Sequence, residues 1–313
     1  MDPLSDVLSL LKPQSYAFRG LDAGGRWAID FPPGRGIKCY ALTAGQCWLW
    51  IDGGDAPIAL AAGDCVLLPR GHAFRFGSDA DAPARDALEL FPAVGLGDIV
   101  TVNGGGSCTG IGGYFDFIGP HADLLLRILP PVIHLRSEAD KAALRLSIER
   151  LMQELREPRP GGALLAEHLA QTLLIQALRL HIADGAAQGV GWLFALADRR
   201  MCAAITAMHA EPGKRWTLDA LASHVGMSRS SFAARFKATV GEPAMEYLTR
   251  WRMLTAADRL TRGDLPVATI AFALGYESES AFSVAFKRVI GCSPGRYARQ
   301  SSSGPHGSSL NSA

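Results

Sequence analysis

The chain has few of the features that would place it in a membrane or in an oxidising compartment. No segment contains the run of about 18 apolar residues that a transmembrane helix needs, and the N-terminus lacks the basic region of a signal peptide. The six cysteines are scattered and include no Cys-x-x-Cys pair. We therefore expect no membrane contact, no disulfide framework and a reducing cytoplasmic location.

Sequence motifs of catalysis are also missing. We find no Gly-x-Ser-x-Gly, no His-Glu-x-x-His and no cluster of carboxylates. The glycine-rich stretch NGGGSCTGIGG, at 103–113, is followed neither by the Lys-Ser/Thr pair of a phosphate-binding loop nor directly by a helical pattern, so we expect a flexible hairpin connection there. The sequence predicts neither an enzyme nor a cofactor.

The net charge of +1 conceals an uneven distribution. Residues 199–300 contain 15 Lys and Arg against 8 Asp and Glu, a balance of +7, whereas the rest of the chain contains 16 basic and 22 acidic residues, a balance of −6. With 48% apolar and 19% charged residues, the 313-residue chain has the composition and length of a globular protein with two domains. A basic domain of this kind is suited to binding phosphates.

The basic half contains one pattern written twice, between residues 216 and 297. Phe232, Phe236, Lys237 and Gly241 recur with identical spacing as Phe282, Phe286, Lys287 and Gly291, and Ala222 and Gly226 recur as Ala271 and Gly275. Each copy reads as a short helix, a turn with glycine and a second helix, which predicts helix-turn-helix motifs at 217–241 and 267–291. The segment from Pro243 to Gly263 predicts one connecting helix of about five turns, suited to successive major grooves about 34 Å apart.

The repeated half resembles the DNA-binding region of the AraC/XylS family of bacterial transcription regulators. The resemblance rests on WTLDALASHVGMSRSSFAARFKATVGEPAMEYLTRWRM and IAFALGYESESAFSVAFKRVIGCSPGRY. The N-terminal half is similar to the cupin-type sensor domain of one branch of that family, through PIALAAGDCVLLPRGHAFRF and LLLRILPPVIHL. Residues 15–91 alternate in short runs such as QCWLWI, which by itself predicts antiparallel strands of a small barrel or sandwich.

The resemblance narrows the N-terminal prediction to a cupin barrel, but the usual metal ligands of cupin enzymes are absent. No His precedes His72, Tyr40 lies near where the first motif would offer a His, and Phe74 takes the usual His position of the second motif. We therefore expect no metal and a loop position for His72. Barrel mouths often bind small ligands, although aromatic side chains in small barrels are more often core. The candidate ligand contacts are Tyr40, Trp48, Trp50, His72 and Phe74.

From residue 137 the apolar period becomes helical. Leu144, Ile148, Leu151 and Leu155 form one stripe, and residues 163–183 are apolar on much of the helix surface. The resemblance implies a dimerisation element here, with capping of the barrel as the alternative. The fold prediction is an α+β multidomain chain with a cupin-like antiparallel β-barrel over 1–136, a helical dimerisation segment over 137–184, a linker over 185–197, an all-α double helix-turn-helix domain over 198–300 and a disordered tail over 301–313.

With the phenylalanines facing inward, the opposite face of each second helix is available to DNA. The candidate DNA contacts are Arg229, Ser230, Ser231, Ala233, Ala234 and Lys237 in the first copy and Ser278, Glu279, Ser280, Ser283, Val284, Lys287 and Arg288 in the second. Arg229, serine hydroxyls and Glu279 can reach base edges, whereas Lys287 and Arg288 suit phosphates. A solvated helix face is the alternative for each charged residue.

These patterns predict a sequence-specific DNA-binding transcription regulator whose barrel senses a small molecule. The alternative is a cupin-type enzyme or small-molecule-binding protein with a helical appendage. The expected partners are double-stranded DNA, a small-molecule effector, a second copy of the chain and, at a promoter, RNA polymerase.

Overall fold

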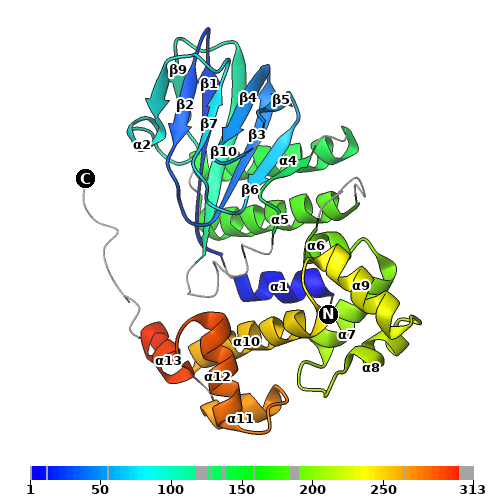
Figure 1. The fold of residues 1–313 in the computed structure, drawn as a ribbon. Coiled ribbons are helices and arrows are strands. Elements are labelled where there is room, and N and C mark those ends of the chain that lie inside the picture. The colour runs from blue at the N-terminus through cyan, green and yellow to red at the C-terminus, as the bar shows by residue number, and fades with distance from the viewer. Residues whose placement is uncertain are drawn as a thin grey trace. The chain divides into compact units, whose positions relative to one another are not determined.

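The structure is a computed structural model that describes residues 2–11, 13–54, 56–117, 126, 129–135, 138–157, 159–183, 190–263 and 265–302. The chain divides into two compact units (Figure 1). One contains Pro13–Ile118 and Leu126–Gln188, and the other contains Met1–Lys12 and Gly189–Ala313. The first residues thus group with the C-terminal half, whereas the sequence-based boundaries, which stay a prediction, assign them to the barrel. Residues 185–189 of the expected linker and residues 303–313 of the expected tail lie outside the described residues.

The N-terminal unit contains two sheets. In the six-stranded sheet the order is β11 (Ile133–Leu135), β6 (Cys65–Leu68), β3 (Ile37–Ala44), β10 (Cys108–Phe117), β1 (Pro13–Ala23) and β9 (Ile99–Val102). In the five-stranded sheet it is β5 (Ile58–Ala61), β4 (Gln46–Ile51), β7 (Phe74–Gly77), β2 (Ala28–Phe31) and β8 (Ala84–Asp86). Neighbouring strands are antiparallel except for the pairs β1–β9 and β2–β8, which are parallel.

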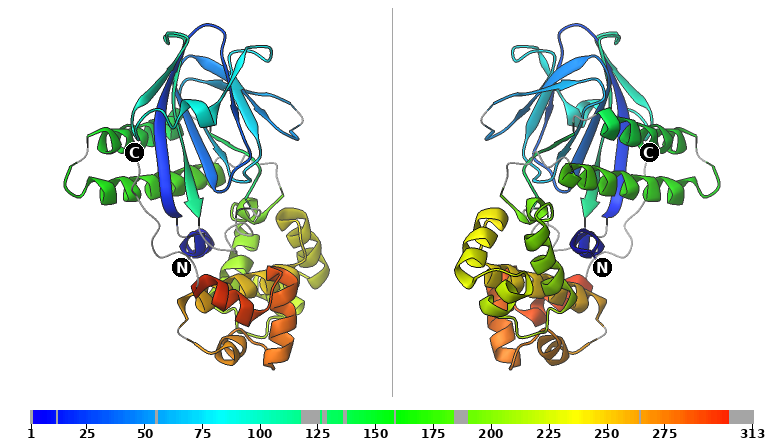
Figure 2. Two further views of the ribbon diagram at one scale, coloured as in Figure 1. Left: turned by 90° about the vertical axis from the view of Figure 1, so that its left-hand side faces the viewer. Right: turned by 90° about the vertical axis from the view of Figure 1, so that its right-hand side faces the viewer.

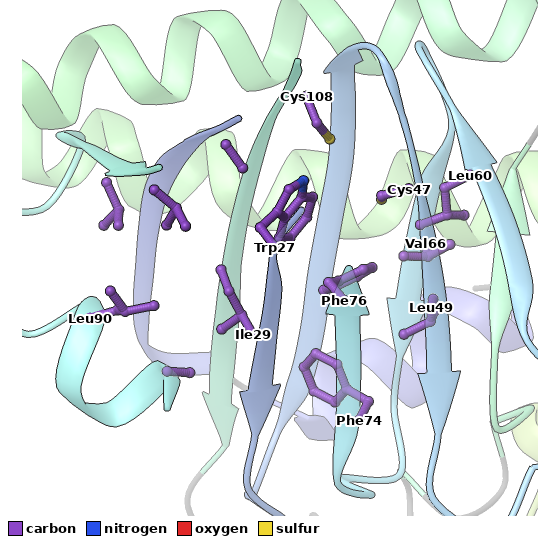
Figure 3. Close-up of a cluster of buried hydrophobic side chains, with 14 of the residues drawn as sticks. Trp27, Ile29, Cys47, Leu49, Leu60, Val66, Phe74, Phe76, Leu90 and Cys108 are labelled. Carbon is purple, nitrogen blue, oxygen red and sulfur yellow. The ribbon is translucent and has the colours of Figure 1, made fainter. Parts of the chain in front are cut away.

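The two sheets share one apolar core, because alternate side chains of each strand face inward. In β4, Cys47 and Leu49 are buried while Gln46 and Trp48 are exposed, as the alternation in QCWLWI predicts. Ile29 and Phe76 from the five-stranded sheet and Val66 from the six-stranded sheet belong to the same buried cluster (Figure 3). The predicted β-rich, cupin-like class of this half is confirmed.

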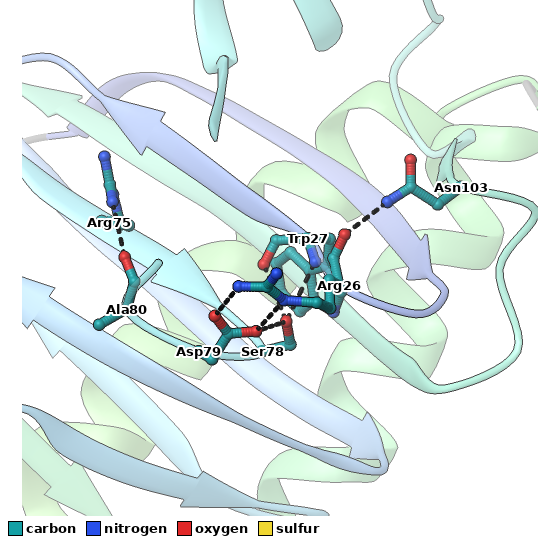
Figure 4. Close-up of polar contacts among 7 residues, drawn as sticks. All are labelled: Arg26, Trp27, Arg75, Ser78, Asp79, Ala80 and Asn103. Atoms are coloured by element: carbon teal, nitrogen blue, oxygen red, sulfur yellow. Dashed lines mark hydrogen bonds and ion pairs between the residues drawn. The ribbon is translucent and has the colours of Figure 1, made fainter. Parts of the chain in front are cut away.

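Polar contacts connect the turns around Trp27 (Figure 4). Arg26 forms an ion pair with Asp79 at 2.9 Å, and the backbone N–H of Trp27 donates to the Ser78 hydroxyl at 3.0 Å. The Asn103 side chain donates to the Arg26 carbonyl at 2.8 Å. These bonds hold the backbone around Trp27, whose large side chain is almost fully buried and lines the cavity described below.

The N-terminal unit also contains helices that contact its strands. α2 (Ala87–Leu90) follows β8, and the long helices α4 (Glu138–Arg156) and α5 (Gly162–Ala183) lie side by side along the six-stranded sheet (Figures 1 and 2). Leu144, Ile148 and Leu151 of α4 are buried, as the predicted stripe requires. The Ser147 hydroxyl donates to the Gln176 side chain at 2.8 Å and joins the two helices.

Helices are the regular elements of the C-terminal unit in its described residues. Its helices are α6 (Trp192–Ala195), α7 (Arg199–Ala210), α8 (Leu218–His224), α9 (Arg229–Val240), α10 (Ala244–Arg262), α11 (Val267–Ala273), α12 (Glu279–Ile290) and α13 (Pro294–Ser302), joined by the N-terminal helix α1 (Pro3–Leu11). Val7 of α1 is buried, and Asp6 lies 3.3 Å from the His209 ring on α7. α10 is the predicted connecting helix; it ends at Gly263, whose φ of 73° lies in the left-handed region that favours glycine.

Candidate nucleic-acid interface and interior cavity

The first helix-turn-helix consists of α8 and α9. The Ser228 hydroxyl accepts from the Ser231 backbone N–H at 3.2 Å and so fixes where α9 begins, and Gly241 ends the helix at a φ of 92°. Phe232 and Phe236 are fully buried with ring centroids 5.6 Å apart. One face of α9 is therefore held in the core.

The second copy, α11 and α12, repeats this construction. The Ser278 hydroxyl accepts from the Ala281 backbone N–H at 3.2 Å, and Gly291 ends α12 at a φ of 93°. Phe282 and Phe286 are fully buried, and their centroids are again 5.6 Å apart. The predicted duplication is thus present in the caps, the buried rings and the helix lengths.

The candidate DNA contacts lie away from these rings. Exposed positions are Arg229, Ser230, Ser231, Ala234 and Lys237 on α9 and Glu279, Ser280, Val284, Lys287 and Arg288 on α12, while Ala233, Ser278 and Ser283 are partly buried. The hydroxyls of Ser231 and Ser278 take part in the N-terminal caps. The hydroxyls of Ser230 and Ser280 lie 3.4 Å and 3.1 Å from those of the capping residues Ser228 and Ser278, so they can exchange these exposed contacts for a base.

The exposed faces of α9 and α12 differ in their ion pairs. Arg229 lies 3.4 Å from Asp219 on α8, and both side chains are about two-thirds exposed, so this pair can open at little cost. Lys237, Lys287 and Arg288 form no ion pair with any described residue. The sequence reasoning missed Arg235 on α9, whose Nε donates to Asp198 at 2.8 Å ahead of α7. No local pattern signals this pair, because its partners are 37 residues apart.

A cavity of about 420 Å³ lies between the two sheets of the N-terminal unit. Three rows of paired residues form its wall on the six-stranded sheet: Ala17, Tyr114 and Lys38; Arg19, Gly112 and Tyr40; and Leu21, Gly110 and Leu42. Trp27, Ile29, Phe31, Cys47, Leu60 and Phe76 close it from the other side. Its size is in the range of small-molecule sites.

Glycines of β10 leave room for this cavity. A Cβ atom on Gly112 would lie 2.3 Å from the Tyr40 ring, so no other residue fits beneath that ring. Burial raises the pKa of the Tyr40 phenol. The expectation of a flexible connection over 103–113 was wrong for 108–113, which belong to a central strand with neighbours on both sides. Their glycines accommodate a neighbouring aromatic ring, a role that composition alone does not reveal.

Known protein families match the N-terminal and C-terminal parts of the chain separately. Residues 2–183 match the family model described as a cupin, and residues 221–300 match that of a helix-turn-helix domain. A putative AraC-like transcription regulator of Streptomyces antibioticus is 45% identical over 95% of this chain and 98% of its own length. The chain belongs to the AraC/XylS family. It is a DNA-binding transcription regulator and not an enzyme, as the sequence predicted.

Two further proteins align over similar lengths of the chain. The RCS-specific HTH-type transcriptional activator RclR of Escherichia coli is 32% identical over 95% of this chain and 97% of its own length. The crystal structure of ToxT from Vibrio cholerae covers 92% of this chain and 98% of that chain, at 11% identity and a TM-score of 0.38.

Of the five candidate ligand contacts in this family member, only Tyr40 lines the cavity. Phe74 is buried and its ring stacks on Phe31 at 4.5 Å. Trp48 is exposed on the outer face of β4, Trp50 lines a shallow outer depression, and His72 is an exposed loop residue. The sequence missed the cavity-lining cations Arg19 and Lys38, whose even spacing from Leu21 and Tyr40 would have placed them on the inner face.

The described residues contain no group of three or more His, Cys, Asp or Glu side chains arranged to hold a metal ion. Among them, no helix has the length and apolar character required to cross a membrane.

Proposed function

We propose that this regulator reads DNA with α9 and α12, each placed in a major groove. The observation that carries the proposal is the duplicated construction, in which the same buried phenylalanine pair turns an exposed helix face outward twice. α10, with 19 residues, is about 28 Å long and connects the two motifs. A connection of this length suits two recognition helices that enter successive grooves.

Within this interface we assign different roles to polar and basic residues. Ser230 and Ser280 have short hydroxyl side chains, and the Glu279 carboxylate can accept hydrogen bonds. All three lie near the helix N-termini, where recognition helices contact base edges. Ala233, Ala234, Ser283 and Val284 offer small or apolar surfaces to thymine methyl groups. Lys237, Lys287 and Arg288 contact phosphates, and Arg229 contacts a base or a phosphate once its pair with Asp219 opens.

The interior cavity is the proposed effector site. It is enclosed by two sheets, lined mainly by apolar side chains and separate from the helix-turn-helix unit in sequence, which suits a sensor domain. The relative RclR is named a transcriptional activator, which supports activation as the outcome for this chain as well. At a promoter, RNA polymerase is then a further partner.

Self-association is assigned to α4 and α5. Leu146, Leu164, Leu165 and Ile175 are large apolar residues exposed on these helices. Covering them with a second copy would remove apolar surface from water. We expect residues 13–188 to sediment as a dimer at micromolar concentration, whereas a monomeric fragment would contradict this assignment.

The DNA-binding proposal is tested by fluorescence anisotropy with DNA from upstream of the protein's own gene, at fixed salt. We expect tight binding that survives excess unrelated DNA and is lost in a double variant, Ser230→Asp with Ser280→Asp, which places carboxylates against the bases. Ala56→Asp with Ala62→Asp, at two exposed positions of the N-terminal unit, is the charge-matched control. Equal affinity for specific and unrelated DNA would contradict sequence-specific recognition.

A further inference from the structure

Lys38 is an unusual residue for the wall of an apolar cavity. It lies on β3, partly buried, and its ammonium group is 4.5 Å from the centre of the Tyr114 ring. Burial lowers the Lys38 pKa, and Asp116 opposes that shift from a distance. No carboxylate among the described residues lies within ion-pair distance of it.

The other charged residue of the cavity does not compensate for Lys38. Arg19 is also a cation, and its Nε donates to the Val94 carbonyl at 3.0 Å, which holds the guanidinium in place. None of the described lining residues is acidic. The cavity therefore presents two positive side chains and no negative one to whatever enters it.

An ammonium group that loses water without gaining an anion costs folding free energy. A ligand with a carboxylate would supply the missing partner, and a charge-assisted hydrogen bond in such surroundings is stronger than one in water. Most of the remaining wall, which includes Trp27, Phe31, Phe76 and Phe91, offers apolar surface to the rest of the ligand.

We propose that the cavity binds a hydrophobic molecule with a single carboxylate, which accepts a hydrogen bond from the Lys38 ammonium while the apolar body packs between the two sheets. This rests on the proposed effector site and names its ligand class. Tyr114, whose ring supports the ammonium, is the positioning residue. The volume of about 420 Å³ accommodates a medium-length acyl chain or a two-ring aromatic acid.

The test uses the full-length protein and titration calorimetry with four probes: decanoate, decanol, naphthoate and naphthol. Each acid is paired with an alcohol of similar skeleton, so the comparison isolates the carboxylate. We expect at least one acid to bind about ten- to hundredfold more tightly than its alcohol. Lys38→Met should abolish that preference and leave alcohol binding unchanged.

Arg35→Met is the matched control, because Arg35 is an exposed cation nearby that does not line the cavity. It should keep the preference for acids. Met is unbranched and apolar, so Lys38→Met should remain folded, with a melting temperature equal to or above that of the natural protein. Thermal unfolding checks this before any titration.

Two results would overturn the inference, and they separate it from the proposed functions. Equal binding of acids and alcohols, unchanged in Lys38→Met, would leave the cavity as an effector site but for a neutral ligand. Failure of all four probes to bind the folded protein would also remove the support for an effector site there. In that case, retained DNA affinity would show that the DNA-reading function stands independently.

Discussion

The two helix-turn-helix motifs have the same interior and different surfaces. The phenylalanine pairs, serine caps and terminal glycines coincide, but Arg229 in the first copy corresponds to Glu279 in the second, Ala234 to Val284 and Ala238 to Arg288. The interior residues fix the angle and length of each second helix. Because the outward residues do not follow the repeat, the copies are expected to prefer different base sequences.

The copies also differ in how they are supported. The Phe236 ring packs edge-on against Tyr247 with centroids 5.8 Å apart, and the Phe286 ring packs in the same way against Tyr297 at 5.6 Å. Each copy therefore packs against an equivalent tyrosine. Among the described residues, the Arg235–Asp198 ion pair of the first copy has no counterpart in the second, where the matching position is Ala285. The phenylalanine–tyrosine packing is thus common to both copies, whereas the Arg235–Asp198 pair is a feature of the first copy.

The largest expected effect concerns the shared interior. Phe236→Ala and Phe286→Ala each remove a fully buried ring, and each should lower the free energy of unfolding of this unit by about 3–5 kcal/mol. Similar losses in the two variants, measured by denaturant unfolding of the full-length protein, would confirm that the copies are equivalent inside. A loss below about 1 kcal/mol in only one of them would show that its interior is not tightly packed.

The sequence predicts this duplicated interior well because its determinants are local. A serine cap, phenylalanines four apart and a terminal glycine all act within one helix, so their spacing is visible without tertiary structure. The Asp198–Arg235 pair, the grouping of α1 with α7 and the glycines beneath Tyr40 depend on residues distant in the chain. The sequence therefore predicted the fold class and the outward helix faces, but not the cavity wall or its cations.

The second prediction concerns support found only in the first copy. Asp198 caps α7 by accepting from the backbone N–H groups of Arg200 and Met201, and it binds Arg235. Asp198→Ala should cost about 2–3 kcal/mol through the lost cap and ion pair. Asp198→Asn, which keeps the cap, should cost about 1 kcal/mol.

The pH dependence of that support has a definite sign. Burial opposes ionisation of Asp198, but Arg235 and the backbone amides outweigh it and hold the Asp198 pKa below its usual range. The charged form therefore stabilises the fold above the unfolded-state pKa of about 3.9. The stabilisation is lost as the pH falls through the lower folded-state value. The stability gap between the natural protein and Asp198→Asn should shrink over that acidic range; a constant gap would contradict the ion-pair explanation.

The third prediction concerns the most different outward pair. Glu279 can accept from cytosine N4, whereas arginine favours guanine, so Glu279→Arg should change the preferred base at one position by about 1–3 kcal/mol. Arg229→Glu should do so only if Arg229 reads a base instead of a phosphate. Binding selections with each variant measure both effects, and Glu277→Arg, outside the recognition helix, is the control for added charge. An unchanged preference in Glu279→Arg would refute the reading role of Glu279.

The smallest expected effect concerns the outward residues that the copies share. Lys237 and Lys287 occupy equivalent exposed positions, and we assign both to phosphates. If that is correct, replacing either by alanine should weaken binding to all sequences alike. Each change should also reduce the slope of log affinity against log salt by about one unit, because one fewer counterion is released. Anisotropy titrations at several salt concentrations measure the slope, and the double variant should lose about two units if the contacts are independent. A changed sequence preference in either variant would show that the lysine reads bases, and that the copies differ even where their residues coincide.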